Sequence, residues 1–177
     1  GTGSLRVGFD FLREWYPYKD AKVYIADPTW PTHGGIAARA GFESVKYRYY
    51  DRENKGFDCA GMLEDLDKAD EGSIILLHMC AHNPTGCDPS QEQWAQILEV
   101  IKRKNHFAAF DNAYQGFATG DLEKDAYSLR LFSKNYSNIC LFQSMAKNFG
   151  LYGERAGCVS FMATSEKEAA ILSSRIK

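Results

Sequence analysis

Short apolar runs typical of buried strands alternate with helical patterns along most of this chain. The clearest run is SIILLHM at residues 73–79, which is apolar almost throughout, as strands covered on both faces are. A helical pattern at 88–104 follows it, and a further apolar run comes at 106–111. Parallel strands need a crossover connection, usually a helix, so this alternation predicts an α/β fold. We expect a mainly parallel sheet flanked by helices on both faces.

The remaining segments continue the same alternation. Asp58 is a candidate N-cap for one helix, and Asp88 or Ser90 for the helix at 88–104. No low-complexity linker or internal repeat interrupts the pattern, so we expect residues 1–177 to form one domain. Further strands are expected at 22–27, 44–50, 138–144 and 157–163, and further helices at 5–16, 31–42, 58–69 and 126–135, with a helix-like pattern again at 166–177.

Composition excludes several classes of partner. The 177 residues are 45% hydrophobic and 25% charged, with a net charge of −2, so there is no basic field to attract nucleic acid or an anionic membrane. No apolar run approaches the ~20 residues that span a bilayer. No secretory signal opens the chain. We therefore expect neither nucleic acid nor a membrane as a partner.

The cysteines favour a reducing compartment. There are five, an odd number scattered through apolar segments, which is unlike a disulfide framework. Cys80, His82 and Cys87 lie close in sequence, but their spacing matches no closed zinc pattern, so we expect no metal site. We expect the protein in the cytoplasm. A mitochondrial location is the alternative, because any transit segment would precede Gly1.

Polar side chains follow three of the predicted strands at the point where each strand ends. In sheets of this kind, ligands bind beyond the carboxyl ends of the strands. We therefore expect these side chains to lie at one site. They are His78 and Asn83 after the strand at 73–79, Asp111 and Tyr114 after 106–111, and Ser144 and Lys147 after 138–144.

Lys147 stands among small and apolar residues in QSMAKNFGLYGERAG, at 143–157. Two interpretations are open. Its stem can cover apolar surface while the amine reaches water, as in most lone lysines of this kind. Alternatively, an apolar pocket or nearby cations can lower the pKa of the amine, which then forms a Schiff base with a carbonyl.

Three other residues also have ordinary explanations when taken singly. Asp111 can cap a turn, Asn83 in HNPTG can be a turn residue, and Arg155 can pair with Glu154. With Lys147 they describe a site for a phosphorylated, aldehyde-bearing pyridine. A carboxylate beneath such a ring keeps its nitrogen protonated and makes the ring an electron sink. An arginine, hydroxyls and the amides of GTGS at a helix start suit its phosphate.

Five long motifs, occurring in order, make the sequence similar to a known family. With these motifs the chain resembles the aspartate aminotransferases, class I, fold type I enzymes that depend on pyridoxal phosphate. The resemblance covers essentially all 177 residues and implies the central part of the large cofactor domain. It also implies that an N-terminal arm and a C-terminal small domain lie outside residues 1–177. The motifs are GTGSLRVG, DPTWPTH, LLHMCAHNPTGCDPS, FDNAYQGFATGDLEKDA and QSMAKNFGLYGERAG.

The resemblance implies a role for each matching residue around the pyridine ring. Lys147 would form the Schiff base and then carry the proton from the substrate. Asp111 would pair with the ring nitrogen, while Tyr114 and Asn83 would hydrogen-bond its phenolic oxygen. Lys147, Asp111 and Tyr114 are therefore the predicted catalytic residues. Trp30 would stack on the ring, and Trp30 and Asn83 would also contact substrate.

The resemblance also implies how the phosphate is held. Gly1 and Thr2 would contribute backbone amides, with Ser144 and Arg155 beside them. His78 and His82 would be supports near Asp111 and the ring. One departure is Ala146, where the family usually has a serine. A hydrogen bond to a charged group is worth about 1.5–3 kcal/mol, so we expect weaker binding of the cofactor.

The implied reaction converts L-aspartate and 2-oxoglutarate to oxaloacetate and L-glutamate in a homodimer. In this family, arginines that bind the substrate carboxylates come from segments outside residues 1–177, so we expect the chain to hold the cofactor half of the site. Two alternatives remain open. The chain could bind the cofactor without turnover, or belong to an aromatic or broad-specificity aminotransferase.

Overall fold

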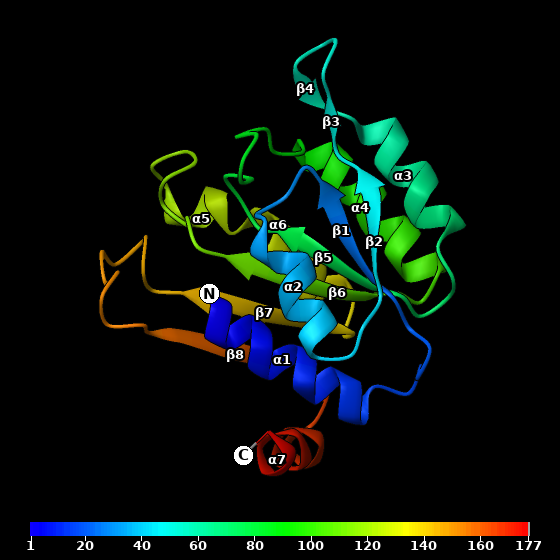
Figure 1. Cartoon of the computed structure of the whole chain (residues 1–177), viewed down its shortest axis with the longest axis vertical. Helices are drawn as coiled ribbons and strands as arrows, with labels where there is room; N and C mark the ends of the chain where they lie inside the picture. The colour runs from blue at the N-terminus through cyan, green and yellow to red at the C-terminus, as the bar shows by residue number, and fades with distance from the viewer. Residues whose placement is uncertain (177) are drawn as a thin grey trace.

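The computed structural model describes residues 1–176, which form a six-stranded sheet in the order β2-β1-β5-β6-β7-β8 (Figure 1). Neighbouring strands are parallel from β2 to β7, as predicted, and β8 alone runs antiparallel to its neighbour β7. The strands are β1 (Val23–Asp27), β2 (Ser44–Arg48), β5 (Ile74–His78), β6 (Phe107–Asn112), β7 (Ile139–Ser144) and β8 (Gly157–Phe161).

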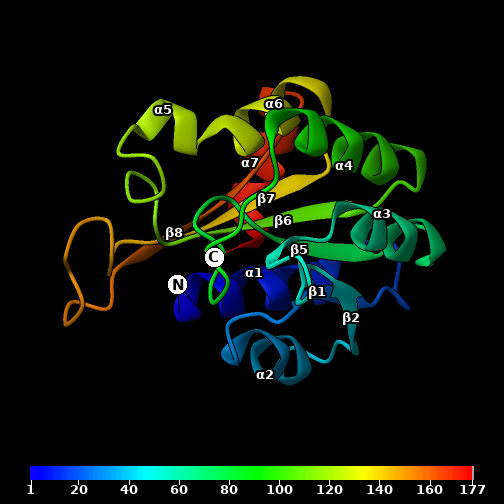
Figure 2. The same cartoon turned by 90° about the horizontal axis from the view of Figure 1, so that it is seen from above.

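Helices cover both faces of this sheet, which confirms the predicted architecture. Figure 2 shows α1 (Thr2–Trp15) and α2 (Thr32–Arg39) on one face. On the other face lie α3 (Cys59–Lys68), α4 (Gln91–Arg103) and α6 (Tyr127–Asn135). Each face has its own hydrophobic core, and β5, apolar and buried along its whole length, contributes to both.

Helix α1 packs very closely on the sheet. Its apolar stripe buries Leu5, Phe9 and Leu12. Gly8 faces β7, and a Cβ atom at this position would overlap the ring of Phe142. The missing side chain therefore lets the helix backbone approach the strand, which holds the start of α1 beside the carboxyl end of β7.

Ser90, rather than Asp88, caps α4. The Ser90 hydroxyl accepts a hydrogen bond from Gln93 N at 3.2 Å, and Gln93 Oε1 accepts one from Ser90 N at 2.8 Å. Asp88 instead accepts hydrogen bonds from the backbone nitrogens of Ala81 and His82, at 2.6 and 2.9 Å. It thus stabilises the turn that follows β5. The other predicted cap is confirmed, since Asp58 accepts from Gly61 N at 2.8 Å.

Several elements were not expected from the sequence. A small hairpin pairs β3 (Tyr50–Asp51) with β4 (Gly56–Phe57), and a short helix α5 (Leu122–Asp125) precedes α6. The direction of β8 was also not foreseen. Residues 145–156 join it to β7 without a helix, so the chain returns antiparallel. The helix-like pattern near the end of the chain forms α7 (Glu166–Arg175), where the Arg175 guanidinium lies 4.2 Å from the ring centre of Trp15.

Within residues 1–176, no helix combines the length and the apolar character that crossing a membrane requires.

Candidate active site

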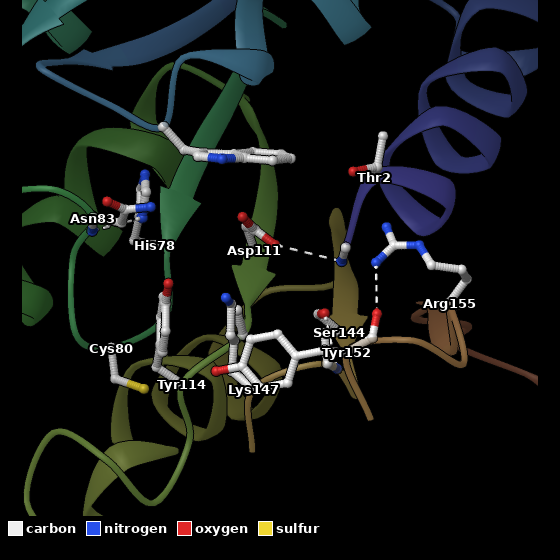
Figure 3. Close-up of a pocket in the computed structure, with 14 residues that line it drawn as sticks. Thr2, His78, Cys80, Asn83, Asp111, Tyr114, Ser144, Lys147, Tyr152 and Arg155 are labelled. Carbon is white, nitrogen blue, oxygen red and sulfur yellow. Dashed lines mark hydrogen bonds and ion pairs between the residues drawn. The ribbon is translucent and has the colours of Figure 1, made fainter. Parts of the chain in front are cut away.

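A cavity of 320 Å³ lies at the carboxyl ends of β5, β6 and β7, beside the start of α1 (Figure 3). The structure brings every residue predicted to bind a cofactor to its lining, although their chemical roles remain predictions. They are Gly1, Thr2, Trp30, Asn83, Asp111, Tyr114, Ser144, Lys147 and Arg155.

Lys147 and Asp111 reach this cavity from different parts of the sheet. Asp111 belongs to β6, and Lys147 follows the end of β7 (Figure 3). The Lys147 amine lies 4.2 Å from the ring centre of Tyr152, within range of a cation–π interaction. A lysine amine and a carboxylate therefore share one cavity, as the predicted site requires.

The Asp111 carboxylate is 12% exposed, and its two oxygens have different surroundings. Oδ2 lies 3.0 Å from Nε2 of His33. Oδ1 is buried and has no hydrogen-bond partner within residues 1–176, with the Gly1 nitrogen 3.9 Å away. Burial raises the pKa of Asp111, but the hydrogen bond from His33 and electrostatic interactions with neighbouring groups lower it by more. The result is an ionised carboxylate with one acceptor left free.

A chain of hydrogen bonds extends from Asp111 to the turn after β5. Thr29 Oγ1 lies 2.9 Å from His33 Nδ1 and 2.9 Å from His78 Nε2. The Nδ1 atom of His78 accepts from Asn83 N at 3.4 Å. Because a carboxylate only accepts, His33 donates from Nε2, Thr29 donates to His33 Nδ1, and His78 donates from Nε2 to Thr29. One protonation pattern thus satisfies every member of the chain.

In this hydrogen-bonding pattern the rings of His33 and His78 each carry a single N–H proton. Burial, followed by the neighbouring His33, lowers the pKa of His78 to about 4. The negative charge is therefore confined to Asp111, at the cavity end of the chain.

His33 and Thr29 were missed as site residues in the sequence. The sequence indicated His78 and His82 as the supports of Asp111, but the structure gives the direct contact to His33, and His78 acts only through Thr29 and His33. His82 stacks on the ring of Tyr49, with centroids 3.7 Å apart. The only available signal was the four-residue spacing of Thr29 and His33 in DPTWPTH, although Thr29 lies before α2 and not in its first turn.

The other end of the cavity is suited to an anion. Helix α1 begins here at Thr2, and the first-turn amides of a helix attract negative charge. A Cβ on Gly1 would lie 3.1 Å from Ser144 Oγ, so the helix start and this hydroxyl are neighbours. Arg155 is exposed, and its Nη1 donates to the Tyr152 carbonyl at 3.1 Å (Figure 3). Ala146 lines the same end without a hydroxyl.

Comparison with known protein families identifies the class of protein to which this fold belongs. The chain belongs to the family of class I and II aminotransferases, whose family model matches residues 1–176.

Individual members of that family are closely similar. The chain is 52% identical to the mitochondrial aspartate aminotransferase of Schizosaccharomyces pombe, over 100% of this chain and 40% of that protein. The aspartate aminotransferase of Trypanosoma cruzi superposes with a TM-score of 0.95 at 49% identity, over 99% of this chain and 45% of that one. An aromatic-amino-acid aminotransferase of Burkholderia pseudomallei, covalently bound to pyridoxal phosphate, superposes with a TM-score of 0.94 at 44% identity, over 99% and 43%. The chain therefore spans less than half the length of these relatives.

Proposed function

We propose that residues 1–177 are the central part of the cofactor domain of an aspartate aminotransferase. The reaction is transfer of the amino group of L-aspartate to 2-oxoglutarate, giving oxaloacetate and L-glutamate, with pyridoxal 5′-phosphate as cofactor. The observation that carries the proposal is the placement of Lys147 and the ionised Asp111 on one cavity, with Asp111 Oδ1 buried and free.

The residues present fit this cofactor. The free oxygen of Asp111 is a ready acceptor for a protonated ring nitrogen, and the hydrogen bond from His33 keeps that carboxylate charged. Tyr114 and Asn83, which line the cavity from two different turns, supply donors for the phenolic oxygen. Trp30 supplies a flat surface for one face of the ring.

The anion end fits the phosphate group. The amides at the start of α1, the Ser144 hydroxyl and the Arg155 guanidinium together offer neutral and charged donors. Arg155 adopts a left-handed backbone conformation, with φ +54, which is uncommon for a residue other than glycine.

When bound, pyridoxal phosphate supplies an electron sink for the bond that breaks at the substrate Cα. Within this chain, Lys147 Nζ would hold the cofactor and would take the proton released at the substrate Cα. Asp111 would keep the ring nitrogen protonated, and Tyr114 would donate to the ring oxygen. The hydrogen-bonded chain through His33 and Thr29 holds Asp111 in position.

Substrate selection and assembly are also part of the proposal. We propose that the arginines for the two substrate carboxylates lie outside residues 1–177 and that the longer protein is a homodimer. The name of the S. pombe relative favours mitochondria over the cytoplasm as the location.

Covalent attachment of the cofactor tests the proposal. Incubated with pyridoxal phosphate, the protein should develop the visible absorbance of a lysine-bound cofactor, and borohydride should fix the added mass on Lys147. K147A should lose both signals, whereas K68A, at an exposed lysine of α3, should keep them. Attachment to another lysine, or none, would overturn the assignment.

A second function is favoured by the similarity to the aromatic-amino-acid enzyme, at 44% identity. Rates with aspartate and with phenylalanine, measured on the longer protein that carries this chain, separate the two. If the cofactor binds to Lys147 but aspartate never converts it to its amine form, the chain binds without turnover.

A further inference from the structure

Asp125, the last residue of α5, is buried directly after an exposed stretch of chain. Its exposed fraction is 3%, whereas every residue from 117 to 124 is exposed. Its Oδ2 accepts from Gly116 N at 2.7 Å and Ala118 N at 3.1 Å. Its Oδ1 accepts from Thr119 N at 3.1 Å and Thr119 Oγ1 at 2.6 Å. Four donors from one loop therefore surround a single carboxylate.

The loop that Asp125 holds begins at Tyr114, which lines the cavity. The Tyr114 carbonyl accepts from Phe117 N at 2.9 Å, which closes a tight turn. Gly116 occupies this turn with φ +93, a conformation that favours glycine. Its N–H is the one that Asp125 binds at 2.7 Å, so the carboxylate fixes the turn that starts at Tyr114.

The residues directly after Asp125 pack in the core of the fold. The next residue, Ala126, is buried in the core, and Ser128 in the first turn of α6 donates to the Met79 carbonyl at 2.9 Å. This bond joins α6 to the end of β5. Asp125 thus connects the core to a loop whose own apolar side chain, Phe117, is 65% exposed and contributes little packing.

We propose that Asp125 is a positioning residue for Tyr114. Its buried carboxylate orients the turn from which the phenol faces the ring oxygen of the cofactor. The inference rests on the proposed function, because it assigns Tyr114 a partner in pyridoxal phosphate. Hydrogen bonds to a charged acceptor are stronger than neutral ones, and here they replace the apolar packing that the loop lacks.

The test compares D125N with Y114F, with the double variant and with D121N. Asp121 is the matched control, because it is an exposed aspartate that caps the same short helix through Glu123 N and Lys124 N. The first readout is amide hydrogen exchange over residues 114–119 without cofactor. We expect at least tenfold faster exchange in D125N and no change in D121N.

The second readout is the pH midpoint of the absorbance of the bound cofactor. D125N should shift it in the same direction as Y114F, and the double variant should shift it no further than Y114F alone. Faster exchange with an unchanged midpoint, or additive shifts, would overturn the proposal. If D125N fails to fold, T119V leaves Asp125 in place and removes the exposed hydroxyl that donates to it, together with the weaker contacts of that hydroxyl to the Asp121 backbone. It should give smaller effects of the same sign.

The two proposals fail in different ways. If wild-type protein does not bind pyridoxal phosphate at Lys147, the proposed function fails whatever the exchange rates show. If exchange over residues 114–119 is unchanged in both D125N and T119V, Asp125 does not hold the turn, even where the cofactor binds normally.

Discussion

The Nε2 atom of His33 lies 3.0 Å from Oδ2 of Asp111, joining residues 78 positions apart. His33 belongs to α2 and is fully buried, whereas Asp111 belongs to the central strand β6. The contact therefore connects a surface helix to the floor of the cavity. It also compensates the cost of burying the carboxylate, which would otherwise raise its pKa.

Replacing His33 by phenylalanine should raise the pKa of Asp111 and destabilise the fold at neutral pH. A buried acceptor that loses its partner costs about 1–3 kcal/mol. In the wild type the pKa is lowered, so the stabilisation from the ionised carboxylate is present above the ordinary aspartate pKa and is lost only as the pH falls below that value. In H33F the raised pKa lets the buried carboxyl take up a proton as the pH falls from 7 to 4, which removes the cost of the unpaired charge. Urea unfolding should therefore show a larger difference between H33F and wild type at pH 7 than at pH 4. An equal difference at both pH values would contradict this account.

Because of His82, the free energy of unfolding should fall as the pH is lowered from 7 to 5. Burial, then the neighbouring His78 and His33, lowers the pKa of His82 to about 2. Because the folded pKa lies below the ordinary value of about 6.5, the unfolded chain binds the extra proton, and stability falls as the pH drops below that value. Each such histidine contributes a slope of up to about 1.4 kcal/mol per pH unit.

The variant H82F keeps an aromatic ring against Tyr49 and removes the titration. Unfolding free energies at pH 7, 6 and 5 should fall less steeply in H82F than in wild type. Parallel curves would show that the pKa of His82 is the same in the folded and the unfolded chain.

The close approach of α1 to the sheet should make Gly8 intolerant of a side chain. In G8A the new methyl group overlaps the Phe142 ring, and overpacking of this kind costs about 1–3 kcal/mol. Gly3 lies in the first turn of the same helix, and a Cβ atom there would meet nothing beyond its own helix within 4 Å among residues 1–176, so G3A should be neutral or slightly stabilising. Urea unfolding of both variants measures the difference. Equal effects would mean that helix propensity, and not packing, decides the outcome.

Restoring a hydroxyl at position 146 should strengthen binding of the phosphate group. Ala146 lines the anion end of the cavity, where A146S would add one donor to a charged acceptor, worth about 1.5–3 kcal/mol. Dissociation constants for pyridoxal phosphate and for pyridoxal, which lacks the phosphate, separate this effect from general changes. We expect tighter binding of the phosphorylated compound alone. The same gain with both compounds would place the new hydroxyl away from the phosphate.

Residues such as those of β5 and α4 show why much of the fold could be predicted. The run at 74–78 is apolar throughout and buried throughout, and Trp94, Ile97, Leu98 and Ile101 share the buried face of α4. The buried face of a helix or strand can be predicted from the spacing of its apolar residues, which is a local property of the sequence. The cavity lining could also be predicted, because parallel strands bring their carboxyl ends to one edge.

The missed features depend on contacts between distant residues. Nothing near His33 in sequence indicates that it faces Asp111, and nothing near Tyr114 indicates that its turn is organised around Asp125. The antiparallel direction of β8 depends on which neighbour the strand finds after a loop without a helix.

By itself, the sequence determined the alternation of strands and helices, the burial of the central strands, and the set of polar residues at their carboxyl ends. These follow from local patterning and from the geometry of parallel sheets. Only the tertiary structure decided which partner each buried polar group has, with His33 on Asp111 and Asp125 on the Tyr114 loop. Hydrogen bonds act over about 3 Å, so their partners are chosen only after packing has brought separate elements together.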